Sequence, residues 1–238
     1  MFDPFGDFAT SGYLRNVASL RDPEEIATVQ HSYFVAALDS AVGHLRRQKN
    51  IAYADFCEVH RLLFEGFYPW AGCDRLALGV GEYISKAGRV QFECSDRAQA
   101  AVEAGLGVGN DRAAMAVRPG HVMGYFAWGH PFLDGNGRTM MVVHAELLHR
   151  AGFIVDWSRT RKDEYLEVLT QELLDPRANL LDAYVTPLLL PADPGASWVD
   201  QLRGMPSLDG RDSDLSDTVA YGSGDQQAEA EYAEIVRK

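Results

Sequence analysis

One short segment, residues 130–138, combines residue types that can bind a phosphate and move a proton. It reads His-Pro-Phe-Leu-Asp-Gly-Asn-Gly-Arg and lies between two helical patterns. Gly135, Asn136 and Gly137 tolerate positive φ, so backbone N–H groups can turn inward there. A helix that we expect to begin at Arg138 would present the positive end of its dipole to the same place. The segment therefore predicts an anion-binding loop.

Three side chains of this loop extend the prediction to chemistry. Arg138 carries a guanidinium that can hold a phosphate, and Asp134 offers an oxygen ligand of the kind that binds Mg²⁺ beside substrate phosphates. His130 titrates near neutral pH and could take the proton from a hydroxyl that attacks the phosphate. The alternative is a tight inter-helix turn without catalytic role. His, Asp and Arg together in one short loop favour a site of phosphoryl or nucleotidyl transfer.

The elements that must position this loop are mostly helices. Asp22 followed by Pro23 is typical of a helix start, and Gly152 is a typical helix stop. Apolar residues recur at helical spacing through most of the chain, so we expect a mostly α fold built as a helical bundle. The expected helices cover residues 22–49, 54–67, 95–106, 111–128, 138–151, 159–174 and 180–190.

Between residues 72 and 95 the helical spacing disappears, and this region holds the main strand candidates. The runs 75–78 and 89–92 could pair as a small β-hairpin, joined by residues 82–88. We expect this hairpin, spanning about residues 80–92, to be the principal β-structure of the chain.

The composition changes after Pro191. Residues 192–238 contain ten acidic and four basic residues, so we predict a domain over residues 1–191, with an N-terminal helical extension, and an acidic tail over 192–238. The Asp, Gly and Ser content between residues 204 and 227 favours disorder. Residues 226–238 could form a short terminal helix that docks on the domain or on a partner.

Composition also excludes several classes of protein. The net charge of −12 argues against nucleic acid as a partner, because nucleic-acid binders need a basic surface. No apolar run is long enough for a membrane span, and the first residues lack the pattern of a signal peptide. Three cysteines without a C-x-x-C pair suggest neither a disulfide framework nor a zinc site. We therefore expect a protein of a reducing cytoplasm.

The loop resembles the signature of the Fic family (Fic/Doc superfamily), H-P-F-x-[D/E]-G-N-G-R-x-x-R, at every specified position through Arg138. Further segments look like landmarks of the same domain, so the resemblance covers roughly residues 10–190. These segments are residues 12–16, 63–72, 84–92 and 155–158.

The resemblance implies a Fic-type helical bundle with a small β-hairpin flap, acting as a protein adenylyltransferase. Such an enzyme transfers AMP from Mg-ATP to a Ser, Thr or Tyr hydroxyl of a target protein. His130 would be the base, Asp134 the magnesium ligand, and Phe132 the anchor of the loop in the core. The implied nucleotide-binding residues are Gly135, Asn136, Gly137 and Arg138. The flap would bind the target segment by strand-like main-chain pairing, and its implied docking residues are Ile84, Ser85, Lys86 and Gly88.

The chain departs from the family pattern at Met141, where a second arginine is usual. That arginine helps orient the terminal phosphate of ATP, so its absence leaves the donor open: ATP, or UTP or a CDP-linked group. The chain also has no [S/T]-x-x-x-E-[G/N] inhibitory helix, which is consistent with a toxin controlled by a separate antitoxin. Two alternatives remain: a nucleotide- or partner-binding module whose catalysis has faded, and a secreted effector that acts in a host cell.

Overall fold

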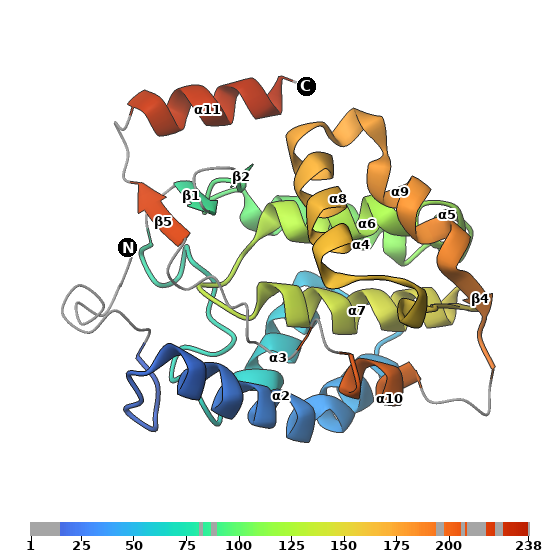
Figure 1. Cartoon of the computed structure of the whole chain (residues 1–238), viewed down its shortest axis with the longest axis horizontal. Helices are drawn as coiled ribbons and strands as arrows, with labels where there is room; N and C mark the ends of the chain where they lie inside the picture. The colour runs from blue at the N-terminus through green and yellow to red at the C-terminus, as the bar shows by residue number, and fades with distance from the viewer. Residues whose placement is uncertain are drawn as a thin grey trace.

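The computed structural model of the chain is mostly helical with a small β-hairpin, as the sequence predicts (Figure 1). Of the expected flap residues, Gly88 lies outside the part of the chain that the structure describes. The described residues are 15–80, 83–86, 90–193, 198–205, 208, 218–221 and 226–237.

The first two helices, α2 (Pro23–Arg46) and α3 (Tyr53–Phe64), pack against each other. The N-terminus of α2 is capped as expected: Asp22 accepts a hydrogen bond from the N–H of Glu25, and proline occupies the first helical turn. Both helices turn apolar side chains inward, and these side chains form one side of the core. The fully buried ones include Phe34, Leu38, Leu45, Phe56, Val59 and Leu63.

The centre of the fold is α7 (Asn136–Arg150), which contacts both α2 and α3 and the helices on its other side (Figure 1). Those helices are α4 (Ala98–Gly109), α5 (Arg112–Val117) and α6 (Pro119–Gly129). The single helix expected over residues 111–128 is wrong, because α5 ends before Pro119 and α6 begins at it. Proline cannot donate the hydrogen bond that would continue α5, but it suits the first turn of a new helix.

The C-terminal part of the expected bundle also differs from the prediction. The helix expected over residues 180–190 is three elements: α9 (Leu180–Val185), the short 3₁₀ turn η3 (Thr186–Leu188) and the strand β4 (Leu189–Pro191). Strand β4 pairs antiparallel with β3 (Phe153–Val155). Pro187 lies at the point where the helix changes, which is where a proline interrupts α-helical hydrogen bonding. The remaining elements here are η1 (Trp157–Arg159), α8 (Lys162–Leu174) and η2 (Pro176–Ala178).

The hairpin is present, but its first strand lies later than expected. Strand β1 (Tyr83–Lys86) pairs antiparallel with β2 (Val90–Gln91). The run 75–78 expected as a strand is instead a series of turns. Asp74 accepts the N–H of Ala77 there, and Arg75 points into the protein with no exposed surface. An inward arginine and a side-chain-capped turn both prevent extended pairing.

Residues beyond 191 form additional elements. Helix α10 (Trp198–Arg203) packs against α2 and α7. Strand β5 (Thr218–Tyr221) joins the hairpin, and α11 (Gln226–Val236) lies over that end of the molecule (Figure 1). Tyr232 of α11 contacts Glu93, Arg97 and Trp128. Within the described residues, no helix combines the length and apolar character that crossing a bilayer requires.

Candidate active site

The loop between α6 and α7 has an unusual backbone at both ends. His130 ends α6 in the left-handed region, with φ 40° and ψ 55°, a conformation that few residues other than glycine adopt. Gly135 precedes α7 at φ 79°, and a Cβ atom there would lie 2.5 Å from the ring of Phe64. At position 135, only glycine combines this positive φ with the close approach to Phe64 without strain. The loop therefore approaches α3 closely and enters α7 at a defined angle.

Helix α7 begins at Asn136, two residues before the expected start at Arg138. The side chain of Asn136 explains why: it accepts the N–H of Phe132 (2.9 Å) and donates to the carbonyl of Phe132 (2.8 Å). This pair of hydrogen bonds closes the loop on itself, while the fully buried Phe132 ring anchors it in the core. The first backbone N–H groups of α7 have no partner within the helix, so this helix end can bind an anion.

Asp134 lies at the centre of a hydrogen-bond network from three elements. Gln30 of α2 and the hydroxyl of Tyr68 (2.9 Å) both donate to its Oδ2, and the guanidinium of Arg138 is 3.6 Å away. Burial alone would raise the pKa of Asp134, but Arg138 and the hydrogen bonds from Gln30 and Tyr68 outweigh it and lower the pKa. Asp134 is therefore an ionised carboxylate held in one orientation.

Arg138 is buried beside this carboxylate. Its guanidinium lies over the ring of Phe64, 4.8 Å from the ring centre. Its Nη1 is buried, and among the residues that the structure describes this atom has no hydrogen-bond partner. Thr139, the next residue of α7, has a buried hydroxyl that also has no hydrogen-bond partner among the described residues. An unsatisfied buried donor is costly, and such a donor is well suited to an anion that supplies the missing acceptor.

His130 is held by contacts to its ring and to its carbonyl group. Its ring stacks on Phe92, with 3.8 Å between ring centres. Its carbonyl accepts from Nε of Arg75 (2.8 Å), whose Nη2 also donates to the carbonyl of Glu93 (2.8 Å). Burial lowers the pKa of Arg75 to about 10, so the guanidinium stays charged at neutral pH. Arg75 therefore fixes the loop end that carries the imidazole.

His60 supports the loop from α3. Its Nδ1 accepts the N–H of Gly72 (2.8 Å), so Nε2 carries the proton and donates to the carbonyl of Asp134 (3.0 Å). The ring stacks on Phe132 at 3.8 Å between centres. Burial lowers the pKa of His60 to about 3, which keeps the ring neutral. This histidine positions the loop and is not available as a base.

Four of these supporting residues were not identified as site residues by sequence reasoning. They are Gln30, His60, Tyr68 and Arg75. Each lies far from the loop in sequence; for example, 104 residues separate Gln30 from Asp134. A single polar residue in an otherwise apolar helical pattern is a weak signal, and polarity in apolar surroundings was the only local signal that these residues carried.

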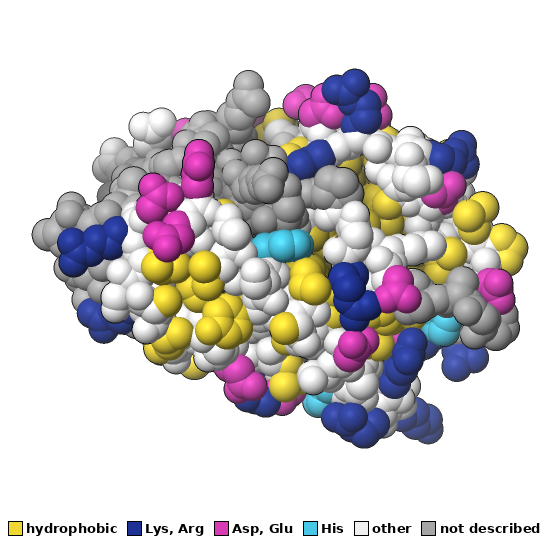
Figure 2. Space-filling model, turned by 60° about the horizontal axis from the view of Figure 1, so that its bottom comes forward, with side chains coloured by type: hydrophobic (Ala, Val, Ile, Leu, Met, Phe, Trp, Pro, Cys, Tyr) yellow, Lys and Arg dark blue, Asp and Glu magenta, His cyan; other side chains and the backbone are white. Residues whose placement is uncertain are grey.

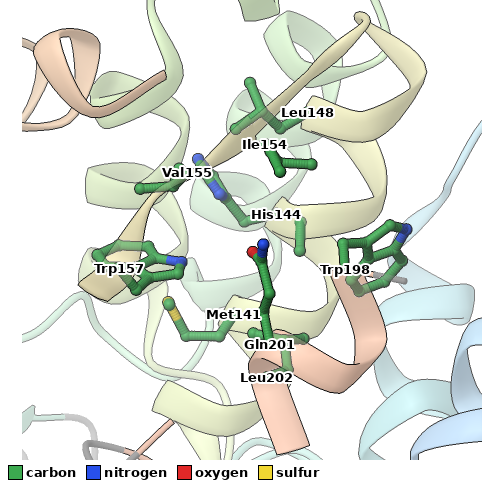
Figure 3. A pocket seen from close by; sticks show the side chains of 10 residues that line it. Met141, His144, Leu148, Ile154, Val155, Trp157, Trp198, Gln201 and Leu202 are labelled. Atoms are coloured by element: carbon green, nitrogen blue, oxygen red, sulfur yellow. The ribbon is translucent and has the colours of Figure 1, made fainter. Parts of the chain in front are cut away.

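Met141 occupies the position of the second motif arginine and is buried in apolar surroundings. Figure 3 shows its side chain beside Trp157 and near Gln201 and Leu202 of α10, in a small pocket that Trp198 also lines. His144, one turn further along α7, bonds the carbonyl of Pro119 (2.8 Å), and burial lowers its pKa to about 4. This part of α7 therefore serves packing, and position 141 offers no charge to a ligand.

The flap lies next to the His130 end of the loop. The carbonyl of Ile84 accepts the N–H of Phe92 (2.9 Å), the residue whose ring stacks on His130. Ile84 and Ser85 are both buried. Lys86 takes part in the strand pairing through its backbone. Phe92 thus links the hairpin to the loop.

Comparisons with known proteins agree on one family. A model of the Fic/DOC family matches residues 50–148, a range that includes the whole loop. Protein adenylyltransferase VbhT of Bartonella schoenbuchensis is 30% identical over 165 residues, covering 68% of this chain and 34% of that protein. A probable protein adenylyltransferase, y4lH of Sinorhizobium fredii, is 27% identical over 164 residues, covering 66% of this chain and 81% of that protein. The chain therefore spans about a third of the length of VbhT.

Solved structures share the fold at lower identity. BepC of Bartonella tribocorum, solved with bound AMPPNP, has a TM-score of 0.62 and 17% identity, covering 77% of this chain and 95% of that one. The N-terminal Fic domain of a putative cell filamentation protein of Bartonella quintana, solved with bound ADP, has a TM-score of 0.62 and 19% identity, covering 78% of this chain and 94% of that one. These likenesses establish the architecture of the helical bundle.

Proposed function

The chain carries a Fic domain of the Fic/DOC family, and on that premise we propose that it is a protein adenylyltransferase, which transfers AMP from Mg-ATP to a hydroxyl side chain of a target protein. The observation that carries the proposal is the loop itself. It places His130 at one end, the ionised Asp134 in the middle and the buried, unsatisfied Nη1 of Arg138 at the other end. The two relatives named as adenylyltransferases support the same activity.

In this proposal His130 takes the proton from the target hydroxyl, whose oxygen attacks the α-phosphorus of ATP. The bond from that phosphorus to the bridging oxygen breaks, and pyrophosphate leaves. Arg138 and the backbone N–H groups of Gly135, Asn136 and Gly137 stabilise the negative charge of the phosphates. The hydrogen bond from Arg75 to its carbonyl and the stacking of its ring on Phe92 hold His130 in place before the target arrives.

The residues present fit a magnesium ion. Asp134 would hold it, and the lowered pKa of this carboxylate keeps it in the form that binds a cation. Within the described part of the chain, no three His, Cys, Asp or Glu side chains gather into a metal site of their own. The ion would therefore depend on the phosphates of the nucleotide for further ligands, as is usual for Mg²⁺. When bound, it neutralises phosphate charge.

The flap would receive the target. Ile84, Ser85, Lys86 and Gly88 are the residues that we assign to docking, through main-chain pairing with an extended segment. The hydrogen bond between Ile84 and Phe92 supports this role, because it joins the strand to the residue that contacts His130. A target segment on the flap would lie beside the base.

A second candidate keeps the fold and changes the donor. Met141 is buried between aromatic and aliphatic side chains and carries no charge for a terminal phosphate. A transferase that uses UTP or a CDP-linked group is therefore the alternative. A faded nucleotide- or partner-binding module is a third candidate, but the shared geometry of His130, Asp134 and Arg138 favours an active enzyme.

The family also suggests a physiological setting. We propose a bacterial cytoplasmic protein, possessing toxin activity and controlled by a separate small antitoxin. The alternative is an effector that acts in a host cell, since several structural neighbours are described as VirB-translocated effectors.

Intact-mass and peptide mass spectrometry test the proposal. The purified protein is incubated in bacterial lysate with Mg²⁺ and with each nucleotide in turn, and modified peptides are identified. His130→Ala is the inactive variant, and His149→Ala, at the far end of α7, is its matched control. An AMP adduct that requires His130 supports adenylyl transfer, whereas a UMP or phosphocholine adduct identifies another donor. No adduct from any donor, with ATP shown to bind, favours the binding module.

A further inference from the structure

The outer edge of flap strand β1 is already occupied by the chain itself. The sheet order is β2-β1-β5, so β1 lies between its hairpin partner and the C-terminal strand β5. Strand β5 lies beside β1 (Figure 1). The two strands pair antiparallel along the full length of β1, with Tyr221 opposite Tyr83 and Thr218 opposite Lys86. A strand has two edges for hydrogen bonding, and both edges of β1 are therefore in use.

Helix α11 docks through Tyr232, the one buried side chain among those of this helix whose burial is described. Tyr232 is only 7% exposed, although its neighbours Glu229 and Glu231 are exposed. Its hydroxyl donates to the carboxylate of Glu93 and accepts from the guanidinium of Arg97. That guanidinium also lies over the Tyr232 ring, 5.2 Å from its centre.

The position that receives Tyr232 belongs to the active-site region. Trp128 stacks on the Tyr232 ring at 6.2 Å between centres and donates through Nε1 to Glu93 (3.1 Å). The carbonyl of Glu93 accepts from Arg75, the same arginine that holds His130. Tyr83 of β1 also contacts the Tyr232 ring, at 5.4 Å between centres. The tail thus contacts the flap at Tyr83, and it contacts Glu93, whose carbonyl shares the donor Arg75 with the carbonyl of His130.

The tail helix is not tightly packed beyond this contact. A cavity of about 260 Å³ remains between α11, α6 and the end of α8, and it is lined by Ile235 and Val236 of α11 and by Leu173 and Tyr125 opposite. Incomplete packing forgoes van der Waals contacts and weakens docking. Tail docking thus depends largely on the Tyr232 contacts and on the pairing of β5, and both can be displaced.

We infer that strand β5 and helix α11 are an intramolecular competitor of the target: docked, they close the edge of β1, and an extended target segment must displace them to reach His130. This inference rests on the proposed function, in which that edge takes the target. Its partner is a strand-forming segment that pairs through its main chain. Because the competitor is tethered, its effective concentration is high without any further contact, so only a target that pairs better than β5 gains access.

The test uses the full chain and releases the tail by point substitution. Tyr232→Ala removes the aromatic ring and its hydroxyl, and Glu231→Ala, on the exposed neighbour, is the matched control. Val219→Pro and Ala220→Pro form a second pair: neighbouring N–H groups of a strand point to opposite sides, so one of the two prolines removes a hydrogen bond to β1 and the other serves as its control.

Two measurements do not depend on catalysis. Amide hydrogen exchange follows residues 83–86, which should exchange faster in Tyr232→Ala than in Glu231→Ala. A fluorescent synthetic peptide of residues 214–238, added in trans, should bind Tyr232→Ala about tenfold more tightly than the parent chain, because one hydrogen bond to a charged group corresponds to about that factor. Equal binding to both proteins would overturn the inference.

The third measurement is catalytic. Incorporation of AMP into lysate proteins, corrected with His130→Ala, should rise about tenfold in Tyr232→Ala and stay unchanged in Glu231→Ala. An unchanged rate in Tyr232→Ala, with His130-dependent transfer measurable, would show that the tail does not restrict access. If no variant transfers a nucleotide, the proposed function fails, while exchange and peptide binding still decide whether the tail occupies the edge of β1.

Discussion

Replacing Arg75 tests how the fold holds His130, the proposed base, in place. The side chain has no exposed surface, and it donates to the carbonyls of His130 and Glu93 at 2.8 Å each. In Arg75→Met these two partly buried acceptors lose their charged donor, and each such loss costs about 1–3 kcal/mol. Removing the buried charge recovers part of this cost, so we expect the free energy of unfolding to fall by about 2–5 kcal/mol.

Two assays separate stability from positioning in this variant. Urea unfolding, followed by circular dichroism, measures the loss of stability. Steady-state AMP transfer at a temperature where the variant remains folded should show a lower kcat with KM for ATP little changed, because Arg75 contacts the His130 end of the loop and not the Arg138 end. Arg75→Lys keeps the charge but not the two-pronged geometry, and it should recover stability only in part.

The exposed Arg177 offers a control, since Arg177→Met should change neither quantity. An ordinary surface substitution changes the free energy of unfolding by less than about 1 kcal/mol. If Arg75→Met changes this free energy by no more than that and keeps the kcat of the parent, then Arg75 does not position the proposed base. A higher KM for ATP with an unchanged kcat would instead assign Arg75 to nucleotide binding.

Three further predictions concern the loop and its supports. Gly135→Ala should destabilise by about 2–4 kcal/mol, from left-handed strain and a Cβ atom 2.5 Å from a ring, and equal thermal stability would contradict the constraint. Met141→Arg should lower the melting temperature of the nucleotide-free protein, since it buries an unpaired charge. Excess ATP should raise the melting temperature of this variant more than excess AMP does. Equal increases with ATP and AMP would place position 141 away from the terminal phosphate. Below about pH 6.5 the unfolded chain protonates His60 and His144 while the folded chain, with pKa values of about 3 and about 4, does not. Stability should therefore fall by about 1.4 kcal/mol per pH unit for each histidine as the pH drops toward 5, with no contribution above pH 7; urea midpoints should fall less steeply in His144→Gln, and equal slopes would refute the assignment.

The sequence by itself determined the features that depend on local chemistry. The loop 130–138 is recognisable because its function requires particular residue types at fixed spacing, and the cap at Asp22 because a helix start is stabilised within one turn. The mostly helical class follows from apolar spacing, which is a property of each segment alone. Proline at position 119 also marked a boundary, although the expected helix ran through it.

Only the tertiary structure decided which distant residues support the loop. Gln30 reaches Asp134 across 104 residues, and Arg75 holds His130 from a segment expected to be a strand. Strand β5 finds β1 across a long chain separation as well. Such contacts depend on how helices and strands come together, and no local pattern records them, because a single polar residue has the same type whether it faces solvent or a buried carboxylate. The residue types therefore specify the chemistry, and the packing of α2, α3 and the turn that carries Arg75 around the loop specifies what holds it.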